Sequence, residues 1–127
     1  MVTRTLVAED IEKGRDVLKA LDDSRIKVRS ALWLYDSEAT SWQLLLALPT
    51  VNRNGPLDTY RKIREALEKR HVDFPIWNIK VLRSTDDFPK LLRRAIKTPP
   101  NAIAGIRFRQ NVIDNELIED AYIYRSA

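Results

Sequence analysis

Side chains that commonly act as nucleophiles or metal ligands are scarce in this sequence. It contains one histidine, His71, and no cysteine, which excludes disulfides, thiolate zinc sites and cysteine nucleophiles. His71 falls at the end of a predicted helix, where a cationic side chain interacts favourably with the helix dipole. A catalytic histidine also needs a nucleophile and an orienting acid beside it, and no motif supplies them. We predict no catalytic residue, metal site or cofactor, and keep an enzyme built from scattered residues as an alternative.

Carboxylates are the other candidates for metal binding, and their spacing argues against such a site. Glu119 and Asp120 are neighbours in a predicted strand, so their side chains point to opposite faces of a sheet. Basic residues occupy the predicted strand that precedes them. We therefore expect Asp120 to pair with Arg107 or Arg109 across two neighbouring strands.

Basic side chains are concentrated in the middle of the chain. The net charge is +4, and residues 25–113 carry 17 basic and 8 acidic side chains, whereas both ends of the chain are acidic. In the predicted helix over residues 86–97, the basic side chains fall within about 100° of one another around the helix axis. Such a stripe can bind phosphates or form an ordinary solvated face. Nucleic-acid association is therefore the alternative function, and it would use Lys90, Arg93, Arg94, Lys97, Arg107 and Arg109.

The hydrophobic pattern predicts three helices and five strands. Apolar residues recur at helical spacing in three segments and alternate with polar residues in most of the others. The predicted helices cover residues 8–21, 57–71 and 86–97, and the predicted strands cover residues 25–35, 42–48, 76–83, 104–113 and 117–125. The order α-β-β-α-β-α-β-β indicates an α+β fold. We expect a mixed, largely antiparallel five-stranded sheet with three amphipathic helices mainly on one face.

The last predicted element, residues 117–125, allows two interpretations. The segment is rich in β-branched and aromatic side chains, which favour strands. Four of its residues would also share one face if it formed a helix. We favour the strand and keep the helix as the alternative.

The first two predicted strands form a hairpin that carries apolar side chains on both faces. One face belongs to the core. If the other face were in contact with water alone, its residues should be mostly polar. On the second face we place Trp33, Tyr35 and Leu45. A large apolar patch is uncommon on a monomer and usually marks a contact. Four alternatives could cover this face: one of the chain's own helices, a second copy of the chain, another protein, or the stacked bases of a single-stranded nucleic acid.

These observations favour a protein–protein interaction domain over an enzyme. The predicted anchors are Trp33, Tyr35 and Leu45, because large buried side chains dominate interface energetics, and the expected partner is another protein or a second copy in a homodimer. The 127 residues are the size of one domain. No segment approaches the ~20 apolar residues of a membrane span, and the N-terminus has no apolar run of signal-peptide length. We expect a single domain over residues 1–127 that is cytoplasmic and makes no membrane contact.

Overall fold

The computed structural model describes residues 5–49, 56–113 and 115–127; residues 1–4, the start of the segment for which no signal peptide is predicted, lie outside this part of the chain. Its elements are α1 (Ala8–Asp23), β1 (Ser30–Asp36), β2 (Ser41–Leu48), α2 (Pro56–Lys69), the short 3-10 helix η1 (Ile76–Asn78), β3 (Ile79–Arg83), α3 (Asp87–Ala95), β4 (Ile106–Ile113) and β5 (Glu116–Ser126). The predicted order of helices and strands is confirmed, and β5 confirms the strand interpretation of residues 117–125. The differences lie at element ends: the first strand begins at Ser30, and η1 replaces the start of the third predicted strand.

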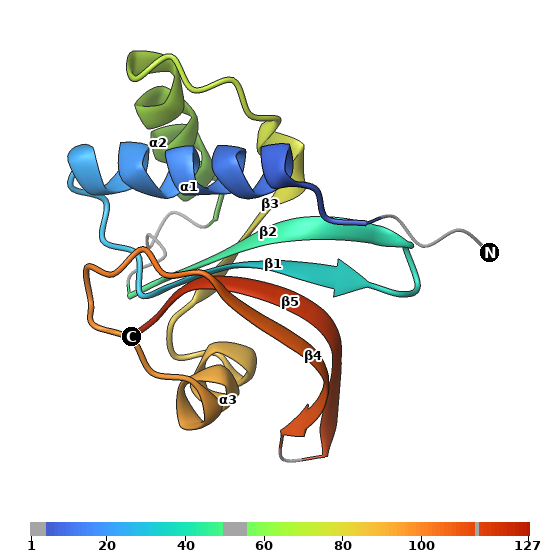
Figure 1. The fold of residues 1–127 in the computed structure, drawn as a ribbon. Coiled ribbons are helices and arrows are strands. Elements are labelled where there is room, and N and C mark those ends of the chain that lie inside the picture. Colours follow the sequence, from blue (N-terminus) through green and yellow to red (C-terminus); the bar gives the residue numbers. More distant parts are fainter. Residues whose placement is uncertain (1–4, 50–55, 114) are drawn as a thin grey trace.

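The five strands form one mixed sheet in the order β3-β2-β1-β5-β4 (Figure 1). Neighbouring strands are antiparallel, except that β2 and β3 are parallel. Parallel strands need a crossover connection, and α2 lies in the one that joins β2 to β3. This architecture confirms the expected α+β fold with a largely antiparallel five-stranded sheet.

Helices cover both faces of this sheet. α1 and α2 lie on one face and α3 lies on the other (Figure 1), so the expected one-sided arrangement holds for two of the three helices. The reason lies in the central strand β1, whose side chains are buried on both sides along most of its length. Because successive side chains of a strand point to opposite faces, burying both sets requires cover on both sides.

The face under α1 and α2 carries a buried polar contact at its centre. The Trp33 Nε1–H donates to the Tyr124 hydroxyl at 3.0 Å, and that hydroxyl donates to the Ile11 carbonyl in α1 at 2.6 Å. Gly14 of α1 allows this approach, since a Cβ at that position would lie 2.6 Å from Trp33 Nε1 and would overlap the Tyr124 hydroxyl. Burial raises the pKa of Tyr124 far above its usual value, although the hydrogen bond from Trp33 opposes the shift.

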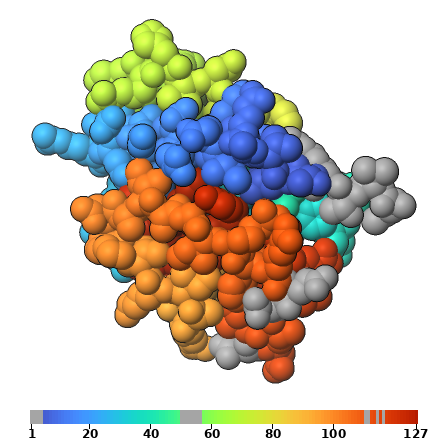
Figure 2. Space-filling view, viewed as in Figure 1, coloured from blue at the N-terminus to red at the C-terminus, as the bar shows by residue number. Residues whose placement is uncertain are grey.

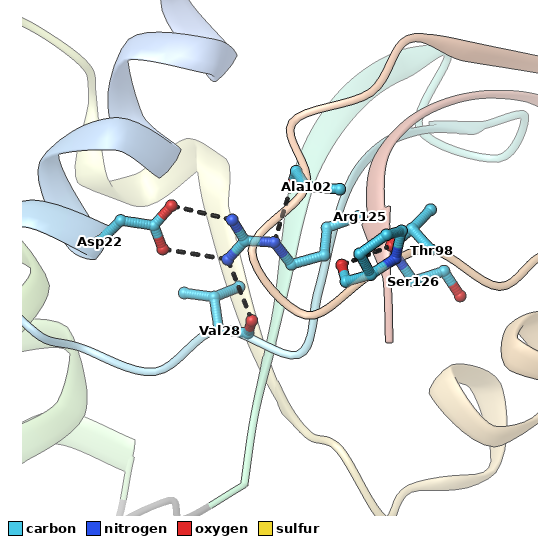
Figure 3. Close-up of polar contacts among 7 residues, drawn as sticks. Asp22, Val28, Thr98, Ala102, Arg125 and Ser126 are labelled. Carbon is cyan, nitrogen blue, oxygen red and sulfur yellow. Dashed lines mark hydrogen bonds and ion pairs between the residues drawn. The ribbon is translucent and has the colours of Figure 1, made fainter.

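A β-bulge brings a second residue of β5 to the same helix. The pairing between β1 and β5 shifts by one residue near the end of the sheet, and a bulge of this kind re-aims side chains locally. Arg125 is only 1% exposed, and its guanidinium donates to both carboxylate oxygens of Asp22 at 2.8 and 3.0 Å (Figure 3). It also donates to the carbonyl oxygens of Val28 at 3.2 Å and Ala102 at 2.9 Å. One buried side chain thus fastens β5 to the end of α1 and to the segments that precede β1 and β4.

The segment between α3 and β4 completes this side of the molecule. Figure 2 shows it in orange beside the blue of α1, with part of the red C-terminal strand visible between them. Thr98 anchors the start of the segment: its N–H donates to the Ser126 carbonyl at 2.7 Å, and its hydroxyl accepts a hydrogen bond from the Ser126 N–H at 2.9 Å. Both residues are drawn in Figure 3.

α3 packs on the opposite face over a smaller hydrophobic cluster. Its Leu92 is fully buried there with Leu32 of β1 and Ile123 of β5. α3 has nine residues and is therefore about 14 Å long. The eleven residues of β5 span about 36 Å. This helix is therefore too short to cover the whole length of the strands beneath it.

The outer edge of β3 is closed by bonds within the chain. Successive N–H groups of a strand point to opposite sides, so those of alternate β3 residues point away from β2. The N–H of Val81 donates to the Tyr60 hydroxyl of α2 at 2.9 Å, and that of Arg83 donates to the Asp86 carboxylate at 2.9 Å. The N–H of Ile79 donates to a carbonyl of η1. β4, at the other end of the sheet, is paired only with β5.

Candidate functional site

The three predicted interface residues do not share one face of the first hairpin. In the observed register, Trp33 lies opposite Leu44 and Leu45 lies opposite Leu32. Directly opposed residues of an antiparallel pair point to the same side. Trp33 and Tyr35 therefore face α1 and α2, whereas Leu45 faces α3. The predicted grouping of these residues on one face is wrong.

All three side chains are also buried within the chain. Trp33 is 3% exposed, Tyr35 is 9% exposed and Leu45 is 5% exposed. The ring of Trp33 packs on Phe74 and that of Tyr35 on Trp42, with centroids 5.8 and 5.5 Å apart. The hairpin face that carries Trp33 and Tyr35 is thus covered by helices of the same chain, whereas Leu45 lies on the opposite face, under the α3 side.

The basic residues of β4 take part in a cross-strand ion pair. The Arg107 Nε and Nη2 donate to the two carboxylate oxygens of Asp120, each at 2.6 Å, and Arg109 Nε lies 3.7 Å from the same carboxylate. This confirms the predicted pairing of Asp120, and the hydrogen bond raises the pKa of Arg107. The Arg107 guanidinium also lies 5.6 Å from the ring centroid of Trp42. Arg107 is paired in register with Tyr122, which packs in the α1–α2 cluster, so this ion pair belongs to that side of the sheet.

The segment of α3 carries the other four basic residues on the opposite side. Arg93 is half-buried and donates to the Ser84 carbonyl at 2.9 Å. Lys90, Arg94 and Lys97 are exposed, although Lys97 follows the last residue of the helix. The six basic residues that the sequence singled out therefore do not form one continuous surface.

An open groove lies on the α3 side of the sheet, beside the first turn of α3. Its volume is about 420 Å³. Apolar residues from four elements line it: Leu34 of β1, Leu45 of β2, Phe88 of α3 and Ile118 of β5. The turn between β1 and β2 also contributes to the lining. We call this feature the α3-side groove.

The apolar surface of the groove continues onto the tip of the β4–β5 hairpin. Leu117 lines the groove, and Val112 lies directly opposite Leu117 in the register of the two strands. Both side chains are largely exposed, Val112 at 64% and Leu117 at 60%. The hairpin curves toward the side of α3 (Figure 1). The groove and this exposed pair together form a larger apolar surface that the short helix α3 leaves open.

Charges of opposite sign stand on different sides of the groove. Lys80 of β3 lines it at the β3 end of the sheet, and Glu119 of β5 lines it beyond β1. Asp36, the last residue of β1, and Glu38, in the turn that follows, add acidic groups to the lining. Within the described part of the chain, neither Lys80 nor Glu119 has an ion-pair partner. These two charged groups are therefore available to a partner.

The groove could not be predicted from the sequence, although part of its pattern is present there. Leu117, Glu119 and Ala121 alternate along β5, which places Leu117 and Glu119 on one face once the strand interpretation is accepted. The exposure of that face depends on the length of α3 and on its position along the strands. Neither quantity follows from an apolar–polar pattern.

Elsewhere in the described chain, Leu57 and Trp77 are exposed at 72% and 78%, and Leu57 lines a smaller depression beside α2. His71 is exposed and has a positive φ of 57° at the end of α2, where it lines a depression of mixed charge with Asp16, Asp23 and Arg70. Residues 5–49, 56–113 and 115–127 contain no group of three potential metal ligands. In the same part of the chain, no helix has both the length and the apolar character needed to cross a bilayer.

Comparisons of the chain with protein-family models, with curated proteins and with solved structures find no match.

Proposed function

We propose that this chain is a protein–protein interaction module that docks a partner in the α3-side groove. The observation that carries the proposal is the exposed apolar pair Val112 and Leu117 beside an apolar groove that is open to solvent. Large exposed apolar surface with a polar rim is typical of interaction sites. The proposal keeps the interaction function that the sequence favours and moves its surface to the α3 side of the sheet, where Leu45 is the predicted anchor that faces the groove.

The groove has the composition that protein interfaces favour. Leucine and phenylalanine side chains form its floor, and charged groups stand at its rim, where water still reaches them. Residues near the centre of such a surface contribute most of the binding free energy, while rim charges set orientation and association rate. Leu117 is the side chain best placed to insert into a partner, since it belongs to both the groove lining and the exposed tip.

Site-specific photocrosslinking tests this proposal. A photoreactive amino acid in place of Leu117, in cells that naturally express the chain, should form discrete covalent adducts with a protein. Leu57 of α2 provides the matched control, because it is also an exposed leucine, at 72%, and lies outside the groove. Equal adduct patterns from both positions, or none from position 117, would contradict the proposal.

Nucleic-acid association is a second candidate. Its supporting observation is that Lys90, Arg94 and Lys97 are all exposed on a chain of net charge +4. Charge-driven binding releases counterions and weakens steeply as salt increases. Replacing all three residues with glutamine should reduce the slope of log affinity against log salt by about one unit per residue. Arg61, Lys62 and Lys69 of α2, changed together, form the matched control set.

Gel-shift titrations at low and high salt measure this slope. Unchanged binding in the α3 triple variant would exclude these three residues as the binding site, and an equal loss in the α2 triple variant would assign the effect to net charge alone. Absence of any shift at low salt would remove the second candidate.

A further inference from the structure

We propose that the partner of the α3-side groove is a basic amphipathic segment of another protein, in which lysine or arginine side chains flank apolar ones. This inference rests on the proposed interaction function and names the chemistry of its partner. The apolar side chains of the segment fill the groove, and its cations lie at the end of the groove where acidic side chains gather.

The lining of the groove is acidic, although the chain as a whole is basic. Among the described residues that line it, Asp36, Glu38 and Glu119 supply three carboxylates against the one ammonium group of Lys80. The whole chain has a net charge of +4. A locally acidic surface attracts a cationic partner and repels the phosphates of nucleic acids and of lipid membranes.

Two of the three carboxylates lie at the same end of the groove. Leu34 of β1 lies opposite Ala121 of β5 in the antiparallel register. Asp36 and Glu119 each lie two residues beyond that pair, toward the same end of the sheet. Both side chains therefore point to the face that Leu34 and Ala121 share, which is the α3 side. Glu38 follows in the adjoining turn and lines the groove there.

Lys80 is too far from this acidic end to neutralise it. Lys80 pairs with Leu45, and Leu45 lies opposite Leu32. Lys80 is thus level with Leu32, which lies four residues before Asp36 on β1 and two strands away from β3. At about 3.3 Å per residue and about 4.8 Å between strands, the Cα atoms of Lys80 and Asp36 are about 16 Å apart. That distance is roughly twice the Debye length of about 8 Å at physiological salt.

The carboxylates at this end are not neutralised by other described side chains either. In residues 5–49, 56–113 and 115–127, no ion pair joins Asp36, Glu38 or Glu119 to a basic group. Asp36 accepts hydrogen bonds from the N–H groups of Glu38 and Ala39, which hold the carboxylate in place and leave its charge uncompensated.

Exposed apolar surface adjoins the acidic end. Leu117 lies two residues before Glu119 on β5, so their side chains share one face of the strand, and both line the groove. A partner that buries Leu117 must therefore also place groups beside Glu119. Burying a carboxylate without a partner is costly, and a second carboxylate would repel it. A segment with a cation next to an apolar side chain satisfies both neighbours at once.

Selection from a library of random peptides displayed on phage tests the chemistry of this partner. The purified chain is the bait, and peptides are kept if their binding is lost with Leu117→Gln and retained with the matched control Leu57→Gln. These groove-dependent peptides should be enriched in lysine and arginine beside leucine, isoleucine or phenylalanine, relative to the unselected library. Groove-dependent peptides that are acidic or uncharged, or a library that yields none, would overturn the inference.

Neutral variants measure the contribution of the carboxylates. The triple variant Asp36→Asn, Glu38→Gln, Glu119→Gln removes three negative charges, and an amide at position 36 can still accept the hydrogen bonds of the turn. The dissociation constant of a selected peptide, measured by fluorescence anisotropy at low salt, should rise about tenfold. The increase should shrink as salt is added. Circular dichroism melts establish that the variant is folded.

The control variant makes the same change in net charge elsewhere. Asp73→Asn, Glu65→Gln and Glu68→Gln alter the same residue types at exposed positions outside the groove. Together they should change the dissociation constant by less than about twofold. An equal increase in both triple variants would assign the binding to net charge and overturn the inference.

The outcomes distinguish this inference from the proposed function. Basic groove-dependent peptides that bind more weakly to the neutral groove variant support it. If position 117 crosslinks a protein through an acidic or uncharged segment, or crosslinks a second copy of this chain, the interaction function stands and this inference fails. If neither a groove-dependent peptide nor a specific adduct at position 117 is found, both fail.

Discussion

The two faces of this sheet are built by different means. On the α1–α2 side, buried polar side chains join the helices to the strands: Arg125 binds Asp22 at the end of α1, and Tyr124 links Trp33 to Ile11. On the α3 side, one helix of nine residues packs mainly through Leu92 over a smaller apolar cluster. Buried polar contacts fix a single geometry because an unpaired partner is costly. Apolar packing is less directional, and here it leaves a groove.

This difference indicates a division of roles between the two faces. The first face holds the fold together, and its large aromatic side chains are part of that function. The second face is only partly covered and carries the exposed side chains that a partner can bury. Substitutions on the two faces should therefore affect different quantities: the free energy of unfolding on the first face, and the affinity for a partner on the second.

Arg125→Met is the strongest test of the first face. The substitution removes four hydrogen bonds from a buried guanidinium and leaves the Val28 and Ala102 carbonyls without that donor. We expect a loss of about 3 kcal/mol in the free energy of unfolding. Arg70→Met is the matched control, because Arg70 is an exposed arginine that pairs with Asp23 at 3.8 Å. It should cost less than about 1 kcal/mol. Urea denaturation measures both, and equal effects would refute the anchoring role of Arg125.

Tyr124→Phe tests the second tie on the same face and should have an intermediate effect. Loss of the hydroxyl leaves the Trp33 N–H and the Ile11 carbonyl without their partner, which we expect to cost about 2 kcal/mol. The pKa of Tyr124 is raised by burial, so the folded state holds this proton more tightly than the unfolded chain does. The associated stability is complete below the usual tyrosine pKa of about 10 and is lost as the pH rises above it toward the higher folded pKa.

The pH dependence separates this role from simple packing. The parent chain should lose stability more steeply than the Tyr124→Phe variant at pH values above about 10. Parallel urea titrations at neutral and alkaline pH measure the difference between the two proteins. Identical slopes in both proteins would show that the hydroxyl titrates freely and is not buried in solution.

Leu117→Asp should have the smallest effect on folding and thereby sharpens the comparison. Leu117 is largely exposed, so the free energy of unfolding of the dilute monomer should change by no more than about 0.5 kcal/mol. Capture of a partner in the groove should be lost, because a carboxylate would enter an apolar recess. Leu57→Asp is the control and should leave both stability and capture unchanged. A destabilisation comparable to that of Arg125→Met would place Leu117 in the core and remove the distinction between the faces.

The fold could be predicted from the sequence because its local patterns agree with its topology. The helical period is clear in all three helices, and the alternation in β1 and β2, together with the β-branched and aromatic residues of β5, predicted strands that the structure confirms. The pairing of Asp120 with the basic residues of β4 followed from the same alternation. The bulge that brings Arg125 to Asp22 could not be predicted, since an added residue in a ladder leaves no mark in an apolar–polar pattern.

The candidate site could not be predicted from the sequence for a related reason. Which side chains share a face of the first hairpin depends on the number of residues in its turn. Asp36 pairs with Ser41, and a register shifted by one residue would have placed Leu45 beside Trp33. Both faces of β1 are apolar, so the pattern also does not say which face each helix covers. The groove results from the short length of α3, which only the assembled molecule reveals.

The closed edge of β3 has a consequence for how copies of this chain can aggregate. Tyr60 and Asp86 occupy the N–H groups of Val81 and Arg83 that would otherwise pair with an incoming strand. Fibre growth by strand addition needs an accepting site at each end of every subunit. With one end sealed, a strand-to-strand contact could join two molecules through β4 and would then terminate, because neither outer end could take a third.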